Sequence, residues 1–308
     1  MFILLSYIGP LPEYTIYCIH QIRLYCNNDI YLITNDLNSH VLNKIKKYNV
    51  KIIPYEQILT DETIHIFTKF YDKFLYLHGK TGAEELFLRS IERFYLAHNL
   101  MNKCDIDNCL FLEIDNLIYD DPNKWTHLLA RKPFSLMSHA NNHCSTGICF
   151  IRDKHSLINF IEYSKYYISR DNPNKDILSE MVCWYEYKNR TKNNDIQVLP
   201  IVFSNTIQND IPEETYECFN DFQSIFDGLA YGIYLLGEDK CHHNSVVKKG
   251  ITNDWFIIHG GKYKYTWITD TKGYKKPYIL DENNNKWILI NNLHVHGKNL
   301  EEGISFSL

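Results

Sequence analysis

Apolar runs and helical repeats alternate along the first part of the chain. Residues 1–7 form a short apolar run, and residues 14–26 repeat apolar side chains at helical spacing. Residues 29–34 (DIYLIT) are apolar and β-branched, and the turn residues Asn35 and Asp36 follow them. Continuous apolar runs of this length indicate buried strands, and apolar side chains at helical spacing indicate an amphipathic helix. The order therefore predicts a β-α-β start.

The same alternation continues up to residue 121. The pattern predicts a helix over 38–48, a strand over 50–54 and a long amphipathic helix over 82–102. Residues 109–119 (CLFLEIDNLIY) read as a strand whose centre carries two acids. Such alternation favours a parallel sheet with helices on both faces, where ligands bind beyond the carboxyl ends of the strands.

The second half of the chain has a mixed pattern. Residues 134–137 and 147–152 are expected to form strands around a polar loop, and 156–167 and 176–187 to form helices. A short strand is expected at 287–290. No repeat or flexible linker divides the chain, so one compact two-lobed unit is the simplest prediction.

Composition excludes several classes of protein. Of the 308 residues, 45% are hydrophobic and 22% charged, as in a folded soluble enzyme. The net charge is -5 and Lys and Arg form no stripe, which argues against nucleic acid as a partner. Gly9, Pro10 and Pro12 interrupt the first apolar run, so we expect neither a signal peptide nor a membrane span. The nine cysteines form no C-x-x-C pair, which favours a reducing, cytoplasmic location.

The acid pair within residues 109–119 is the clearest chemical signal. Glu113 and Asp115 stand two apart, so their side chains point to the same side of a regular strand. Two carboxylates on a buried face need a cation or a proton between them. Mg²⁺ or Mn²⁺, completed by substrate phosphates, would meet that need. The open alternative is a strand end at which both acids are solvated.

A second signal lies near the C-terminus. His294 and His296 stand two apart in an apparently extended segment, and Lys298 follows. Imidazole is a ligand for Mn²⁺-like ions, and Lys is a point charge suited to phosphate. Two surface histidines in a tail are the alternative.

Arginine on the helix before the acid pair is a third candidate. Arg93, with Arg89 one turn earlier, could pair with the acids or with a diphosphate. An ordinary surface ion pair is equally compatible with the spacing. The chain has no G-x-G-x-x-G and no P-loop sequence, so neither cradle holds a nucleotide here.

Taken in order, these features resemble a known family. The β-α-β start, the helix with Arg93, the E-x-D strand, the STGICF strand and the terminal LHVHGKNL are similar to nucleotide-sugar-dependent glycosyltransferases of the GT-A fold. The resemblance implies a Rossmann-type mixed sheet flanked by helices, with a C-terminal extension closing over the donor site. It also implies a nucleotide-sugar-binding half at 1–121, and an acceptor-binding half with the C-terminal tail at 122–308.

The resemblance assigns roles to the residues singled out above. Asp115 would bind the metal that bridges the donor diphosphate, and Glu113 replaces the first Asp of the family's D-x-D motif. His294 or His296 would bind the same metal, and Lys298 the phosphates. Mn²⁺ or Mg²⁺ is the implied cofactor.

The resemblance also places the rest of the donor. The base and ribose would lie at the ends of the first two strands, near Tyr7, Gly9, Thr34 and Asp36. Gly147 would border the donor sugar, because glycine allows a close approach of the backbone.

The catalytic base is open among three acids. An inverting enzyme of this family needs a carboxylate near a helix start to take the proton of the acceptor hydroxyl. Asp176 fits that place, although an acid there also stabilises a helix through the dipole. Glu180 and Asp227 are its rivals.

Together these points predict a metal-dependent glycosyltransferase of hexosyltransferase type. It would move a sugar from a nucleotide diphosphate, UDP by preference, to a glycan or other hydroxyl acceptor. One alternative is a non-catalytic nucleotide- or sugar-binding module on the same fold. The other is a metal-dependent sugar nucleotidyltransferase, which is disfavoured because residues 9–12 (GPLP) hold one Gly and no basic residue.

Overall fold

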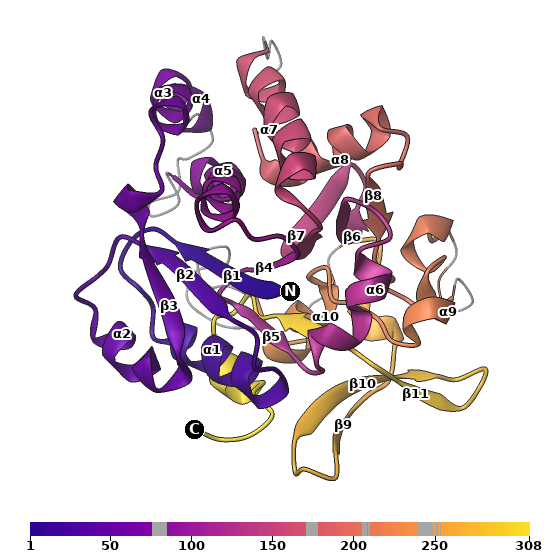
Figure 1. Cartoon of the computed structure of the whole chain (residues 1–308). Helices are drawn as coiled ribbons and strands as arrows, with labels where there is room; N and C mark the ends of the chain where they lie inside the picture. Colours follow the sequence, from indigo (N-terminus) through magenta and orange to yellow (C-terminus); the bar gives the residue numbers. More distant parts are fainter. Residues whose placement is uncertain are drawn as a thin grey trace.

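The computed structural model describes residues 1–75, 85–170, 178–204, 208, 210–238, 249–250, 252 and 254–308 (Figure 1). Its strands are β1 (Phe2–Tyr7), β2 (Ile30–Thr34), β3 (Val50–Pro54), β4 (Cys109–Leu112), β5 (Asn116–Ile118), β6 (Phe134–Ala140), β7 (His143–Ile151), β8 (Ile196–Val198), β9 (Tyr265–Thr269), β10 (Lys275–Asp281), β11 (Lys286–Leu289) and β12 (Asn292–His294).

The helices alternate with the strands in the first half of the chain. The α-helices are α1 (Tyr14–Tyr25), α2 (His40–Ile45), α3 (Asp61–Lys69), α4 (Tyr71–Leu75), α5 (Leu86–Cys104), α6 (Thr126–Leu129), α7 (Lys154–Ser169), α8 (Glu180–Arg190), α9 (Phe219–Phe222) and α10 (Ala230–Leu236). Short 3-10 helices are η1 (Lys46–Tyr48), η2 (Tyr55–Gln57), η3 (Pro122–Trp125), η4 (Glu213–Thr215), η5 (Gly260–Lys262) and η6 (Leu300–Glu302).

A seven-stranded mixed sheet runs through both halves of the chain, in the order β3-β2-β1-β4-β7-β6-β8. Strands β1 to β4 are parallel, β7 is antiparallel to both of its neighbours, and β8 is parallel to β6. Helices cover the sheet, as Figure 1 shows. The predicted fold class, a mixed α/β sheet flanked by helices, is confirmed.

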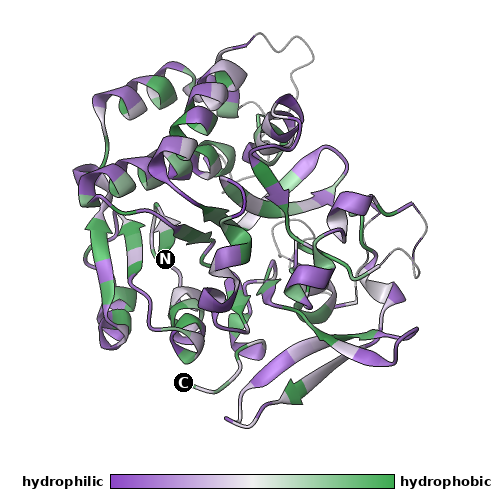
Figure 2. Cartoon of the chain, turned by 45° about the vertical axis from the view of Figure 1, so that its right-hand side comes forward, coloured by the Kyte–Doolittle hydropathy of each residue, from purple (hydrophilic) through white to green (hydrophobic). Residues whose placement is uncertain are grey.

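Successive residues of the central strands face two separate cores. In β1, Ile3 and Leu5 pack in the cluster that contains α1 and α2, whereas Phe2 and Leu4 pack against the α5, α7 and α8 side. Because side chains alternate along a strand, a run that is apolar throughout is buried on both faces. In Figure 2 the strands at the β2–β3 edge are largely green, while the three-stranded sheet β11-β10-β9 is mostly purple and pale.

Residues 109–119 do not form the single strand that the sequence predicted. The strand β4 ends at Leu112, and β5 begins at Asn116 in a different, two-stranded sheet with β12. Between them Asn116 N–H donates to the Glu113 carbonyl at 3.0 Å, so the chain bends there. The acid pair therefore lies in a bend and not on one face of a regular strand.

The predicted polar loop at 138–146 is also wrong. Strands β6 and β7 extend through it as an antiparallel hairpin, whose tip holds Asn142 at φ 63°. All side chains of β6 are buried. Several of these buried side chains are polar, so the hydrophobicity pattern did not predict the full strand.

The C-terminal segment is part of the core. Leu293, Val295 and Leu300 are fully buried, and the Ser305 N–H donates to Gln21 of α1 at 2.9 Å. Tyr119 O–H donates to the Gly303 carbonyl at 2.8 Å. This segment is held by both hydrophobic burial and buried hydrogen bonds.

The sequence predicts neither a membrane span nor paired cysteines. Within the described ranges no helix is both long enough and apolar enough to cross a bilayer. The eight cysteines in the described part of the chain are free thiols.

Candidate metal and donor site

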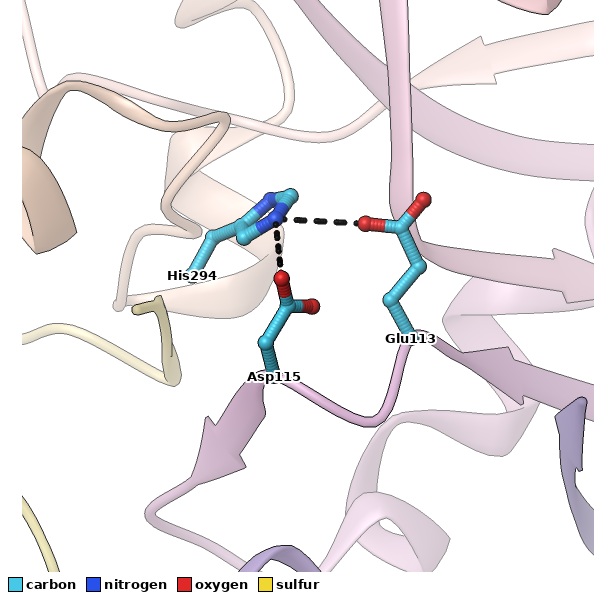
Figure 3. A group of neighbouring side chains, drawn as sticks. All are labelled: Glu113, Asp115 and His294. Atoms are coloured by element: carbon cyan, nitrogen blue, oxygen red, sulfur yellow. Dashed lines mark ion pairs between the residues drawn. The ribbon is translucent and has the colours of Figure 1, made fainter. Parts of the chain in front are cut away.

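Two carboxylates and one imidazole converge where β4 ends. The His294 Nε2 atom lies 3.2 Å from Glu113 Oε2 and 3.4 Å from Asp115 Oδ2. Figure 3 shows both carboxylates pointing toward the imidazole. One ligand atom from each residue lies within 4.8 Å of the other two. Asp115 and His294 are buried, and Glu113 is partly exposed.

Backbone pairing brings His294 to the acids across the length of the chain. In the β5–β12 ladder His294 is paired with Asn116, and the Val295 N–H donates to the Asp115 carbonyl at 2.8 Å. The bend after β4 carries Glu113 and Asp115 to the same end of this ladder. The cluster is thus set by strand pairing and not by flexible side chains alone.

Gly147 of β7 closes one side of the cluster. Its carbonyl accepts the Glu113 N–H at 2.9 Å. A Cβ at position 147 would lie 2.7 Å from His294 Nδ1 and 2.9 Å from Asn116 Nδ2. These distances are below any ordinary contact of a methyl group, so the site needs glycine here.

Each carboxylate has a cationic partner. Arg93 of α5, which is buried, donates to Glu113, to Thr146 Oγ1 at 2.6 Å and to Glu180 Oε1 at 3.3 Å. Lys298 pairs with Asp115. Buried charges need such partners, because desolvation without them costs several kcal/mol per ion.

These pairings shift the titration of the buried groups. Burial alone would raise the pKa of Asp115, but Lys298 and then His294 hold it well below its usual value. Burial alone would lower the pKa of His294, whereas the carboxylates of Asp115 and Glu113 raise it. The site therefore favours an ionised Asp115 carboxylate beside a protonated His294 imidazole.

The donor atoms at this site fit a hard divalent ion. Carboxylate oxygens are the ligands that Mg²⁺ and Mn²⁺ prefer, and imidazole is accepted by Mn²⁺. Glu113, Asp115 and His294 supply two oxygens and one nitrogen at one point. Binding of an ion there by these three residues stays a prediction.

Comparisons with known proteins concern the fold. No family profile and no curated protein sequence matches the chain. Its structure is similar to mouse xyloside xylosyltransferase 1 at TM-score 0.40 and 8% identity, covering 65% of this chain and 84% of that one. It is also similar to the PaToxG glycosyltransferase at TM-score 0.41 and 12% identity, covering 61% and 67%. A third similar structure is CMP:2-keto-3-deoxy-manno-octonic acid synthetase, at TM-score 0.36 and 11% identity, covering 63% and 87%.

Glycosyltransferases are among the structures similar to this chain, as the resemblance in its sequence implied. TM-scores near 0.4 support no conclusion about chemistry.

The residues predicted to hold the nucleotide lie together at the ends of β1 and β2. Tyr7 and Thr34 are paired in the ladder. The N–H of Gly9, whose φ of 123° favours glycine, donates to Asn35 Oδ1 at 2.8 Å. Asp36 accepts the Leu11 N–H at 2.8 Å, which orders the loop before α1. Their contact with a nucleotide stays a prediction.

The three candidate bases differ in their surroundings. Asp176 lies outside the described residues. Glu180 is the first residue of α8, where Ser179 caps the helix, and its carboxylate faces Arg93. The catalytic roles of Asp176 and Glu180 stay predictions.

Asp227 has a different role in this geometry. Its side chain is buried and accepts four backbone N–H groups, from Leu229, Tyr231, Gly232 and His294, at 2.7 to 3.0 Å. Burial raises its pKa, while the backbone donors oppose that shift. With its oxygens engaged in this way, Asp227 positions the backbone of His294, and its role as the base stays a prediction.

His296 does not join the cluster among the described residues. Its N–H donates to the His294 carbonyl at 3.0 Å, so the chain turns directly after β12. The segment after β12 is therefore not extended, unlike the sequence prediction. His294 is the one that meets the acids.

Single substitutions should distinguish the two histidines. We expect His294→Ala to weaken Mn²⁺ binding in the presence of UDP by roughly 10- to 100-fold, because it removes a ligand. We expect His296→Ala to change it by less than about twofold. Mn²⁺ titration by calorimetry measures both. Equal losses in the two variants would contradict this assignment.

Some residues at the site gave no signal in the sequence. Asn292 donates from Nδ2 to Asn116 Oδ1 at 2.9 Å and accepts the Asp227 N–H at 3.0 Å. These buried amides hold β5, β12 and the Asp227 loop together. Single asparagines in a chain rich in Asn cannot be recognised from spacing alone.

Proposed function

We propose that the chain is a metal-dependent glycosyltransferase of hexosyltransferase type. It would move a sugar from a nucleotide diphosphate, UDP by preference, to a hydroxyl acceptor. One observation carries the proposal: Glu113, Asp115 and His294 meet at one point, with Lys298 in contact. A divalent ion bound there would supply positive charge for the leaving diphosphate.

The chain's own residues have separable tasks in this proposal. Asp115 and His294 offer ligand atoms that the β5–β12 ladder holds in place. Arg93 fixes the orientation of Glu113 and ties it to Thr146 on the neighbouring strand β7. Preorganised charge of this kind stabilises a developing anion without rearrangement during the reaction.

Lys298 would change partner during the cycle. In the structure it pairs with Asp115. Its side chain is about one-third exposed, so the ammonium group has room to reach a phosphate. A lysine that leaves Asp115 for the diphosphate would release that carboxylate for its ligand role and neutralise the leaving group.

The proposal is tested with a panel of nucleotide sugars. The protein is incubated with each donor and Mn²⁺, with and without glycan acceptors, and release of nucleoside diphosphate is measured. We expect release from a UDP-sugar. Absence of donor binding and of release across the panel would refute the proposal.

Two other outcomes would identify the alternatives. Tight UDP binding that does not depend on Mn²⁺, with no turnover, would indicate a non-catalytic module. Release of pyrophosphate from a nucleoside triphosphate and a sugar phosphate would indicate a nucleotidyltransferase.

Lys298→Met should have opposite effects on two affinities. Removing the competing ammonium group should strengthen Mn²⁺ binding to the nucleotide-free protein, while loss of the phosphate contact should weaken UDP–Mn²⁺ binding. Each change should be roughly tenfold, as one charge-assisted hydrogen bond would give. Calorimetry with Mn²⁺ alone and with UDP–Mn²⁺ separates the two.

Lys249→Met is the matched control, because the ion pair that the described part of the chain shows for Lys249 is with Glu302. Weaker binding of Mn²⁺ alone by Lys298→Met would rule out the exchange of partners.

A further inference from the structure

A polar pocket with one aromatic wall lies at the tip of the β6–β7 hairpin. It has a volume of about 200 Å³. Trp255 forms the wall, and its side chain is 44% exposed. The polar residues around it include Asn141, Asp210, Asp254, His259 and Lys262.

The Trp255 ring is fixed by its neighbours. Its centroid lies 4.7 Å from the His143 ring, 5.5 Å from the His139 ring and 5.4 Å from the Phe256 ring. The backbone beside it pairs with the hairpin, because the Ile257 N–H donates to the His139 carbonyl at 2.9 Å. A large exposed ring held in this way loses little entropy when a ligand packs on it.

His139 packs against the Trp255 ring as a neutral group. It is buried, and burial together with His143 lowers its pKa to about 3. Neither of its ring nitrogens has a hydrogen-bond partner among the described residues. At neutral pH it therefore packs against Trp255 as an uncharged aromatic ring.

Short contacts connect this pocket with the acid cluster. A Cβ at Gly228 would lie 2.6 Å from the His139 Cβ, so the Asp227 loop is pressed against the hairpin. Asp227 in turn accepts the His294 N–H at 3.0 Å. Contacts thus lead from Trp255 to His139, from His139 to the Asp227 loop, and from Asp227 to the candidate metal ligand His294.

The chemistry of the pocket fits a sugar ring. A pyranose has an apolar C–H face and a rim of hydroxyl groups. An aromatic wall suits the face, and the amide, carboxylate and ammonium groups around it suit the hydroxyls. A hydroxyl on an extended peptide would not need a fixed aromatic plane.

We propose that this pocket binds the acceptor and that the acceptor is a glycan whose ring stacks on Trp255. This inference rests on the proposed function, because it names the second substrate of that reaction. It assigns the acceptor to the turn between β6 and β7, to Gln208, Asp210 and Pro212, and to the segment that begins at Asp254.

Direct binding tests the pocket without turnover. Saturation-transfer NMR with a panel of methyl glycosides and short oligosaccharides is recorded for the wild type, Trp255→Ala and Trp255→Phe. Trp287→Ala is the matched control, because Trp287 is 39% exposed but lies on β11. We expect the glycoside Kd to rise about tenfold in Trp255→Ala, to rise less in Trp255→Phe and to be unchanged in Trp287→Ala.

The outcomes separate this inference from the proposed function. No glycoside binding to the wild type, or equal binding to Trp255→Ala, would overturn the inference. Transfer of sugar to peptide hydroxyls, without glycoside binding, would also overturn the inference. The proposed function as a glycosyltransferase would then still hold. Glycoside binding that depends on Trp255, without release of any donor nucleotide, would refute the proposed function. The pocket would still be a sugar-binding site. Thermal unfolding of the Trp255 variants confirms that they are folded.

Discussion

Asp115→Asn should reduce metal-dependent sugar transfer by on the order of 10³-fold. Asparagine keeps the size of the side chain but removes the charge that Lys298 and His294 face. It also removes an anionic ligand from the three that converge at the site. The loss should be seen in kcat/KM for the donor and in the Kd for Mn²⁺ measured with UDP.

The fold of this variant should persist. Lys298 is partly exposed and can be solvated when its partner loses charge, so no isolated buried ion results. Asp29→Asn is a suitable control, because it weakens only a surface ion pair with Lys51. Unchanged Mn²⁺ affinity in Asp115→Asn, with a folded protein, would show that the acid pair is not a metal site.

Gly147→Ala should weaken Mn²⁺ binding almost as much as Asp115→Asn does, although residue 147 contributes no ligand. The added methyl group would collide with the His294 ring and with the Asn116 amide. Displacing the imidazole by about 1 Å should lower the rate of transfer by roughly 10²-fold. Overpacking should also lower the free energy of unfolding by about 1–3 kcal/mol. Calorimetry with Mn²⁺ and UDP, together with chemical unfolding, measures the two effects.

Gly261→Ala separates the local collision from a general effect of losing glycine. Its methyl group would lie 3.1 Å from a Thr252 carbon and 3.4 Å from the Tyr234 ring, and small shifts relieve such contacts. It should keep Mn²⁺ binding. Wild-type affinity in Gly147→Ala would mean that His294 is free to move away from β7 without loss of its role.

The sequence pattern predicted those strands that are apolar runs between polar turn residues. The strand expected at 50–54 is β3 (Val50–Pro54), and the one expected at 29–34 is β2 (Ile30–Thr34). Both are apolar runs between polar turns, and each pairs with a neighbour in the parallel sheet. Where the pairing partner is distant, the pattern failed. Residues 109–119 are apolar apart from Glu113, Asp115 and Asn116. They divide between two sheets, because β4 pairs with β1 and β7 while β5 pairs with β12.

The candidate site was predictable in part for the same reason. The spacing of Glu113 and Asp115 and the late histidines predicted side chains that the structure brings together, with His294 beside both acids. The ion itself stays a prediction. Which histidine meets the acids depends on the register of β12 on β5 and on the turn after it. The sequence offers Asp227 only as a candidate base, because its four donors are backbone groups that no residue pattern reveals.

The pairing of β5 with β12 has a consequence during synthesis of the chain. The Asn116 and Asn292 side chains that bond across these strands are 176 positions apart. At ordinary rates of translation the ribosome needs roughly 10 to 35 seconds to produce that length. During this interval a nascent chain holds both acids but neither His294 nor Lys298, so it cannot assemble the ligand set. Ordering of the cluster is thus tied to the pairing that joins the most distant of the described strands. Only a chain that has completed this step acquires the charge arrangement on which donor binding would depend.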